Sequence, residues 1–253
     1  MNQREIRKIA SLKLAKYRRE YGRFLVEGIH GVTELLKSDW EADSLIATPE
    51  AMKSGRLASV LKLASERDMK TEVATARELE KMASTKTPQG VVAVAVIPAV
   101  DLKGIKKIAR IVVADGIADP GNLGTIIRTA AAFGFKGLIT TPGSADIFGD
   151  KAVRAAQGAL FSVIPFNHLE TVVIAMNLKR THKFYALTPR SNTAIWSIKE
   201  APRSVLIVGA EAAGVSRELL EVADCEVSIP MTGPIESLNA AVSAGIAMFA
   251  LSR

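Results

Sequence analysis

The 253-residue sequence predicts an α/β protein whose larger part is a parallel sheet with helices on both faces. Short β-branched runs alternate with segments of helical spacing along most of the chain. The strand segments are apolar at nearly every position, as strands buried on both faces are. With 48% hydrophobic and 23% charged residues, the composition is ordinary for a folded domain.

The first alternating series occupies residues 24–97 and predicts a smaller α/β domain. Its pattern predicts strands at 24–26, 44–47, 71–74 and 91–97, and helices at 29–37, 51–67 and 76–82. Pro98, Gly104 and three nearby lysines then indicate a linker. We therefore expect domains at residues 1–98 and 108–253, joined by a linker at 99–107.

The second series predicts the parallel sheet. Its strands are expected at 108–114, 137–140, 161–165, 183–187, 205–208 and 226–229. Its helices are expected at 123–133, 151–157, 169–178 and 217–222, with a final helix that ends at 251. Ligands of such sheets bind beyond the carboxyl ends of the strands. Three unusual junctions of this chain lie at those ends.

Positive charge is concentrated at the N-terminus. The net charge is +7, and residues 1–23 carry six of these charges. A basic arm of this kind suits a polyanion such as RNA. The alternative is an amphipathic helix that leaves its charges in water and packs its apolar side chains inward, namely Ile6, Ile9, Leu12, Leu14 and Tyr17. The candidate RNA-binding residues are Arg7, Lys8, Lys13, Lys16, Arg18, Arg19 and Arg23.

Several classes of protein are disfavoured. A single cysteine, Cys225, rules out an internal disulfide framework. The three histidines are scattered without ligand spacing, so we expect no metal site. No apolar run is long enough to cross a membrane, and the basic N-terminus lacks a secretory core. We expect a cytoplasmic protein with no membrane partner.

The first junction follows the strand at 108–114. Asp119-Pro-Gly is a turn sequence, and Asn122 can cap the helix that follows. Gly124 lies in the first helical turn, and Arg128 follows it by four residues near the same face. An arginine on an otherwise apolar helix indicates a site, or alternatively a structural salt bridge.

The second junction has the spacing G-x-E-x-x-G at Gly209, Glu211 and Gly214. Glutamate stands where the dinucleotide-binding fingerprint has the glycine that lets the backbone approach pyrophosphate. A carboxylate there repels the phosphates, which disfavours NAD and FAD and better suits a cationic or zwitterionic cofactor. The alternative is an ordinary glycine-rich turn between strand and helix.

The third junction is the segment 229–239, Ile-Pro-Met-Thr-Gly-Pro-Ile-Glu-Ser-Leu-Asn, which leads into the final helix. Ser237 and Asn239 are polar groups at a helix N-terminus beside a glycine-proline loop, which is typical of a ligand site. They are alternatively a capping pair, and Met231 is alternatively a core residue.

In order and spacing, these junctions resemble the three motifs of the SpoU (TrmH-like) RNA 2′-O-ribose methyltransferases of the SPOUT superfamily. The resemblance covers about residues 108–253. The N-terminal part is similar to the family's substrate-binding domain, an α/β fold related to ribosomal RNA-binding proteins. Phe24-Leu-Val-Glu-Gly-Ile-His and Thr87-Pro-Gln-Gly-Val-Val-Ala resemble its opening and closing segments.

The resemblance implies a fold, a cofactor and a partner. The fold is a parallel α/β sheet with a C-terminal trefoil knot. S-adenosylmethionine is expected in the knot, held at Gly209, Ile229 and Leu238, with Met231 and Asn239 nearby. A homodimer through the knotted domain is expected, and the small-residue face of the last helix is consistent with close packing.

The implied reaction is methyl transfer to a ribose 2′-hydroxyl of RNA. Because a guanidinium stays protonated, we expect Arg128 to bind the adjacent phosphate or the developing alkoxide. Asn122 is expected to position Arg128 or the ribose, and Glu211 to orient Arg128 or groups of a partner subunit. Ser237 and Asn239 are expected to hold the substrate and the cofactor edge.

Ribosomal RNA, in particular 23S RNA, is the expected substrate because a separate RNA-binding domain suits a large structured RNA. Transfer RNA is the alternative within the class. A non-catalytic RNA-binding or ribosome-assembly protein is a second class. A nucleotide-dependent oxidoreductase is a third, suggested by the α/β alternation alone.

Overall fold

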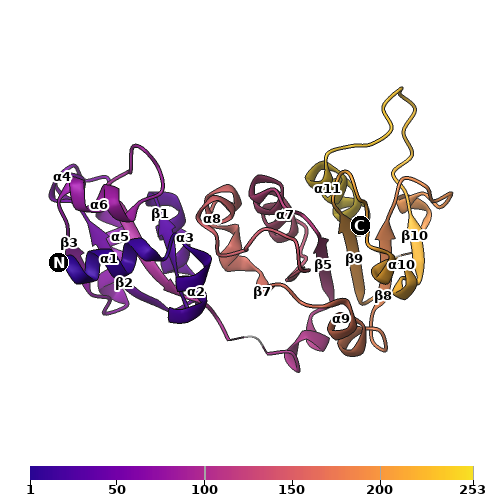
Figure 1. The fold of residues 1–253 in the computed structure, drawn as a ribbon, viewed down its shortest axis with the longest axis horizontal. Helices are drawn as coiled ribbons and strands as arrows, with labels where there is room; N and C mark the ends of the chain where they lie inside the picture. Colours follow the sequence, from indigo (N-terminus) through magenta and orange to yellow (C-terminus); the bar gives the residue numbers. More distant parts are fainter. Residues whose placement is uncertain (100, 200, 253) are drawn as a thin grey trace. The chain divides into compact units, whose positions relative to one another are not determined.

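The computed structural model describes residues 1–99, 101–199 and 201–252. The chain forms two compact units, each with its own sheet (Figure 1). The first unit comprises residues 1–99 and 148–161, and the second comprises the rest of the described chain. The α/β class is confirmed.

The first unit is built on a four-stranded mixed sheet in the order β1-β4-β2-β3. Strand β4 is antiparallel to both of its neighbours, and β2 and β3 are parallel. Every expected strand of this unit is present. The strands are β1 (Arg23–Glu27), β2 (Ala42–Ala47), β3 (Thr71–Val73) and β4 (Val91–Val96). The helices are α1 (Gln3–Ser11), α2 (Ala15–Tyr21), α3 (Ile29–Lys37), α4 (Pro49–Lys53), α5 (Ala58–Glu66), α6 (Ala76–Met82) and α8 (Asp150–Ala156).

The basic N-terminus forms the two helices α1 and α2. Asn2 and Glu5 make a reciprocal capping box that starts α1. Ile6 and Leu12 are buried in the core of the unit, with 1% and 4% of their surfaces exposed, whereas Leu14 is 60% exposed. The amphipathic alternative is therefore correct for Ile6 and Leu12 and wrong for Leu14, and most of the cations remain exposed.

One expected helix is divided. The segment predicted as a single helix at 51–67 forms α4 and α5, which are separated by Gly55. Gly55 has a φ of +73°, a conformation that side chains other than glycine rarely adopt. The left-handed residue interrupts the helical hydrogen bonds, so the chain turns there.

Residues 148–161 pack within the first unit although they follow β6 in the sequence. Phe148 and Phe161 join Phe24 and Trp40 in an aromatic cluster, with centroid distances of 5.1 Å for Phe24–Phe148 and 5.3 Å for Trp40–Phe161. These contacts explain why a division of the chain at its linker does not describe the units. The strand expected at 161–165 also differs, because residues Ala159–Ser162 form a short 3-10 helix, η2, before β7 (Ile164–Phe166).

The second unit contains the parallel sheet, which is confirmed. Its six strands run in the order β10-β8-β9-β5-β6-β7, and every pair is parallel. The remaining strands are β5 (Arg110–Asp115), β6 (Gly137–Thr140), β8 (Lys183–Leu187), β9 (Ser204–Gly209) and β10 (Cys225–Val227). The helical segments are η1 (Gly104–Lys107), α7 (Pro120–Ala132), α9 (Thr171–Leu178), η3 (Ile195–Ser197), α10 (Arg217–Val222) and α11 (Ala240–Ala250).

Helices cover both faces of this sheet. Ile111 and Val113 of the central strand β5 pack in a buried core with residues of α9, α10 and η1. Helix α7 packs against β5 and α11 against β9, and the two helices pack against each other (Figure 1). Part of the expected linker belongs to this unit, because Ile105 of η1 is fully buried in its core. The trefoil knot stays a prediction.

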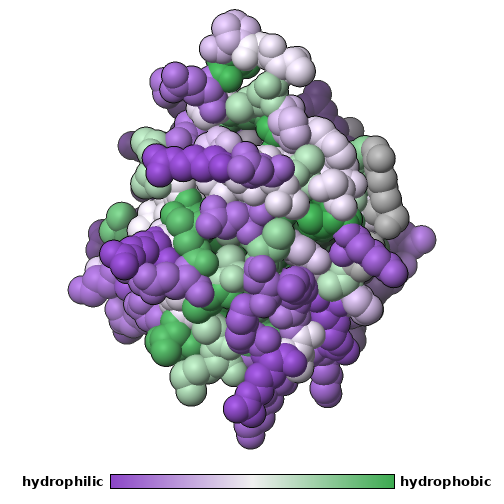
Figure 2. All heavy atoms as spheres, turned by 90° about the vertical axis from the view of Figure 1, so that its right-hand side faces the viewer, coloured by the Kyte–Doolittle hydropathy of each residue, from purple (hydrophilic) through white to green (hydrophobic). Residues whose placement is uncertain are grey.

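The surface of the second unit that lies at the right of Figure 1 includes the edge strand β10. In Figure 2 the apolar side chains of this surface form separate small patches, with long polar side chains between them. Among the described residues, no helix combines the length and hydropathy needed to cross a membrane.

Candidate functional site

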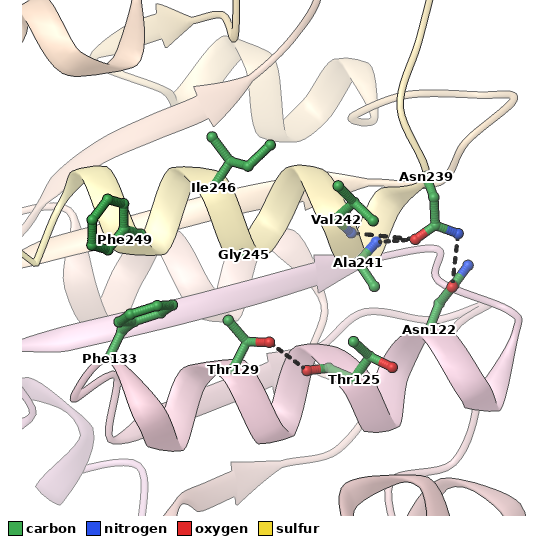
Figure 3. A pocket seen from close by; sticks show the side chains of 10 residues that line it. All are labelled: Asn122, Thr125, Thr129, Phe133, Asn239, Ala241, Val242, Gly245, Ile246 and Phe249. Carbon is green, nitrogen blue, oxygen red and sulfur yellow. Dashed lines mark hydrogen bonds between the residues drawn. The ribbon is translucent and has the colours of Figure 1, made fainter.

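Side chains from all three junctions meet in the second unit. The amide nitrogen of Asn239 donates to Asn122 Oδ1 at 2.9 Å and to Glu211 Oε1 at 2.6 Å. Asn122 Nδ2 also donates to Glu211 Oε1, at 3.1 Å. Figure 3 shows Asn122 and Asn239 directed toward each other from the first turns of α7 and α11. Residues separated by up to 117 positions thus form one hydrogen-bonded triad.

Helix capping explains why these amides are available. Asp119, not Asn122, is the N-cap of α7, and its Oδ1 accepts from the Asn122 backbone N–H at 2.7 Å. This corrects the expectation that Asn122 caps the helix, and it leaves the Asn122 side chain free to join the triad. Asn239 caps α11 with its Oδ1, which accepts from the N–H groups of Ala241 and Val242. Its Nδ2 is then directed at Glu211, so Asn239 is both a cap and a triad member.

Glu211 is the common hydrogen-bond acceptor of the triad. Its Oε1 accepts both asparagine amides and is 3.4 Å from the backbone nitrogen of Ala240. Arg128 is not among its partners. Arg128 is exposed on α7 and makes no hydrogen bond or ion pair with any residue that the structure describes.

The two glycines of the second junction, Gly209 and Gly214, allow the two ends of the turn to contact each other. A Cβ atom on Gly209 would lie 2.0 Å from the carbonyl carbon of Gly214, so no side chain fits there. The Gly214 N–H donates to the Ala210 carbonyl at 2.8 Å, and Gly214 has a φ of +71°. The turn needs glycine at both positions, because Gly209 touches the backbone at Gly214 and Gly214 adopts a left-handed conformation.

A cavity of about 470 Å³ lies between this turn and the third junction. That volume is within the range of small-molecule sites. Its walls come from the end of β8, the turn after β9 and the segment between β10 and α11, which runs out from the sheet and back (Figure 1). The cavity brings together most of the expected cofactor positions, namely Gly209, Ile229, Met231 and Leu238, and it also includes Ser237 and Glu211.

Asp115 is a site residue to which the sequence reasoning assigned no role. It is buried at the carboxyl end of β5, with 7% of its surface exposed. Its Oδ1 accepts the Thr141 hydroxyl and its Oδ2 accepts the Ser216 backbone N–H, each at 2.7 Å. Asp115 thereby fastens the far end of the Gly209–Gly214 turn to the centre of the sheet. The sequence feature that could have indicated Asp115 as a site residue is its position at the end of a predicted strand.

An open groove runs along α7 and α11 beside the triad (Figure 3). The rings of Phe133 and Phe249 close one end, with centroids 5.6 Å apart. Val242 and Phe249 are 50% and 46% exposed, which is high for apolar side chains on packed helices. Asn122 and Asn239 line the other end, so the groove and the triad share residues.

The candidate RNA-binding cations differ in how available they are. Arg18 is buried, and its Nη1 donates to the carbonyl oxygens of Leu12 and Lys13 at 2.8 Å each, so its role is structural rather than RNA-facing. Lys13 Nζ donates to the Lys81 carbonyl at 2.7 Å, and Arg23 pairs with Asp43. The exposed members of the set are Arg7, Lys8, Lys16 and Arg19.

No group of three or more His, Cys, Asp or Glu side chains suited to a metal ion occurs among the residues that the structure describes.

Two family models match the chain. Residues 109–249 match the SpoU rRNA Methylase family, and residues 3–93 match the MRM3-like substrate binding domain. The first match contains all three junctions, and the second contains α1 to α6 and the first half of β4.

Similar proteins cover nearly the whole chain. The 23S rRNA (guanosine(2553)-2′-O)-methyltransferase RlmP of Bacillus subtilis is 34% identical over 95% of this chain and 92% of its own. The 23S rRNA (uridine(2479)-2′-O)-methyltransferase of Streptomyces viridochromogenes is 31% identical over 88% of this chain and 80% of its own. The AdoMet-bound rRNA methyltransferase of Sinorhizobium meliloti superposes with a TM-score of 0.84 at 27% identity, over 98% of this chain and 94% of that one.

Proposed function

The chain belongs to the SpoU rRNA methylase family, and we propose that it transfers a methyl group from S-adenosylmethionine to a ribose 2′-hydroxyl of RNA. The proposed substrate is 23S ribosomal RNA, the RNA named for two of the similar curated proteins. The observation that carries this function is the convergence of Asn122, Glu211 and Asn239 beside a cavity of cofactor size.

The cavity fits S-adenosylmethionine in size and chemistry. Most of its lining is main chain and apolar side chains, which suit an adenosine. Two carboxylates, Glu211 and Glu226, and one cation, Arg190, also line it, so the cavity offers groups of both signs to a zwitterionic cofactor whose sulfonium the carboxylates tolerate. Gly209, Ile229 and Leu238 would hold the cofactor, with Met231 beside them. When bound, the sulfonium supplies an electrophilic methyl group.

The task of the protein is then to place the 2′-hydroxyl and stabilise the charge that develops on it. The triad fixes the Asn122 side chain, which positions the ribose at the cavity. The Arg128 guanidinium has no partner among the described residues, so it is available for the phosphate or the developing alkoxide. Ser237 holds the substrate at the rim.

We propose that the active form is a homodimer in which a second copy covers the groove of α7 and α11. Its exposed apolar side chains, Val242 and Phe249 among them, lie beside Asn122 and Asn239. A second copy at this groove would bring its own groups to the triad, which gives Glu211 further partners to orient. Dimerisation would therefore complete the site rather than only stabilise the fold.

The substitution Val242→Glu tests the proposed homodimer. Val242 is the third residue of α11, where glutamate supports an Asn cap, so the helix itself is retained. A buried, unpaired charge would prevent association. Light scattering should report a monomer that is folded and inactive. A dimer with full activity would contradict the proposed interface.

RNA is held in part by the first unit. Four candidate cations remain exposed on or beside α1 and α2, and the family model that matches this unit is one of substrate binding. We propose a cytoplasmic location, because the proposed substrate is ribosomal RNA.

The experiment that tests the function is methyl transfer from labelled S-adenosylmethionine to unmodified 23S and transfer RNA, with the product mapped by mass spectrometry. We expect one 2′-O-methyl nucleotide in 23S RNA. Methylation of transfer RNA alone would show that transfer RNA is the substrate, and the proposed reaction would stand. RNA binding without transfer to either RNA would instead favour the non-catalytic, ribosome-assembly class.

A further inference from the structure

A smaller cavity lies wholly in the first unit, and none of its lining residues belongs to the three junctions. It opens between α1, α2 and the sheet, and its volume is about 160 Å³. Ile9, Leu12 and Val94 make an apolar floor. The volume is below the range of drug-sized pockets and suits a single flat ring system.

Tyr21 forms an aromatic wall of this cavity. Its ring stacks on that of Tyr17, with centroids 5.8 Å apart and planes inclined by 25°. Lys8 Nζ lies 5.1 Å from the Tyr21 centroid, and Lys16 Nζ lies 5.6 Å from that of Tyr17. Rings that alternate with ammonium groups are how proteins hold single-stranded nucleic acid, because bases stack on the rings and phosphates meet the cations.

The rim of the cavity is rich in hydrogen-bond acceptors. Asp43, Ser44 and Glu72 line it. Asp43 is paired with Arg23, and Glu72 is 3.1 Å from Lys70 Nζ, so ion pairs restrain both carboxylates. Ionised carboxylates only accept hydrogen bonds. Cytosine, adenine and guanine can donate from an exocyclic amino group, whereas uracil has no amino group and its single N3–H lies between two carbonyl oxygens that a carboxylate repels.

We propose that this cavity takes one unstacked nucleobase bearing an exocyclic amino group, from an RNA strand whose phosphates lie on Lys8 and Lys16. The base stacks against Tyr21 above the apolar floor and donates to the rim. The inference rests on the proposed function for RNA as the partner, and its readout does not require methyl transfer.

The test uses the full-length protein and a ten-nucleotide uridine RNA with one central 2-aminopurine, whose fluorescence is quenched by stacking. We expect quenching with the wild type and with Tyr21→Phe, which keeps the ring. Tyr21→Ala should lose the quenching and weaken binding about tenfold, the size of one base–aromatic stack. Ser44→Leu, which fills the cavity and leaves Tyr21 in place, should do the same, so the test stands even where Tyr21→Ala unfolds.

The control is Lys62→Met, which removes a cation with 78% of its side chain exposed on α5 and should leave the quenching unchanged. Cytidine and adenosine decamers should compete better than the uridine decamer. Unchanged quenching in both Tyr21→Ala and Ser44→Leu would overturn the site, and equal competition by all three decamers would overturn the choice of base. Quenching without methyl transfer to any RNA would refute the proposed function and support this base-binding site. Methyl transfer without quenching would support the proposed function and refute the base-binding site.

Discussion

The Asp115 carboxylate should couple the stability of the second unit to cofactor affinity, and Asp115→Asn tests this. The substitution keeps the shape of the side chain and replaces one acceptor oxygen with an amide donor. Asp115 is buried and accepts from Thr141 Oγ1 and from the Ser216 N–H, each at 2.7 Å. Asparagine can satisfy only one of these donors in the same geometry.

The expected magnitude follows from the bond that is lost. A hydrogen bond to a charged group contributes about 1.5–3 kcal/mol, so the free energy of unfolding should fall by roughly 2 kcal/mol. For a chain of this size that is a decrease in Tm of about 4–8 °C. Because Ser216 ends the turn that lines the cavity, the turn should loosen, and the Kd for S-adenosylmethionine should rise about tenfold, on the order of 1.4 kcal/mol.

Thermal unfolding by circular dichroism and titration calorimetry with S-adenosylmethionine measure the two effects. Ser144→Ala is the matched control, because Ser144 bonds Ala114 and Ile117 at the same strand end and does not touch the turn. It should lower Tm and leave the Kd unchanged. An Asp115→Asn protein with normal cofactor affinity would show that Asp115 is structural only, and an unchanged Tm would refute the energetic reasoning altogether.

Four further predictions follow from the same geometry. Arg128→Ala should reduce methyl transfer at least 10²-fold, the size of a catalytic electrostatic contact, with Tm and cofactor Kd near wild type; retention of more than about a tenth of the activity would refute its role. Gly209→Ala places a Cβ 2.0 Å from backbone and should abolish cofactor binding in calorimetry. Burial lowers the pKa of His182 below its ordinary value, so the stability that neutral His182 contributes is present above about pH 6.5 and is lost as pH falls toward the folded-state pKa. The urea midpoint of His182→Gln should not show this loss of stability at low pH. Deletion of residues 1–23 should unfold the first unit because Ile6 and Leu12 are core residues, so Lys8→Met with Lys16→Met is the better test of RNA affinity, measured across a salt series.

The sequence by itself determined the fold class, the parallel sheet and the family. Parallel strands buried on both faces carry continuous apolar runs, and such runs are visible without coordinates. The helices predicted at 29–37, 76–82 and 217–222 agree with the structure to the residue. Three polar junctions at strand ends were also readable, because in such sheets the strand ends are where ligands bind.

Only the tertiary structure decided how the junction residues are used. Whether Asp119 or Asn122 caps α7 depends on a difference of a few residues in where the helix begins, which spacing does not resolve. The burial of Arg18 and the bonds of Asp115 depend on groups brought close by packing. The placement of residues 148–161 on the first unit is likewise set by aromatic contacts between distant segments. Local pattern specifies the elements, whereas these contacts join residues far apart in the sequence, and only the folded chain brings them together.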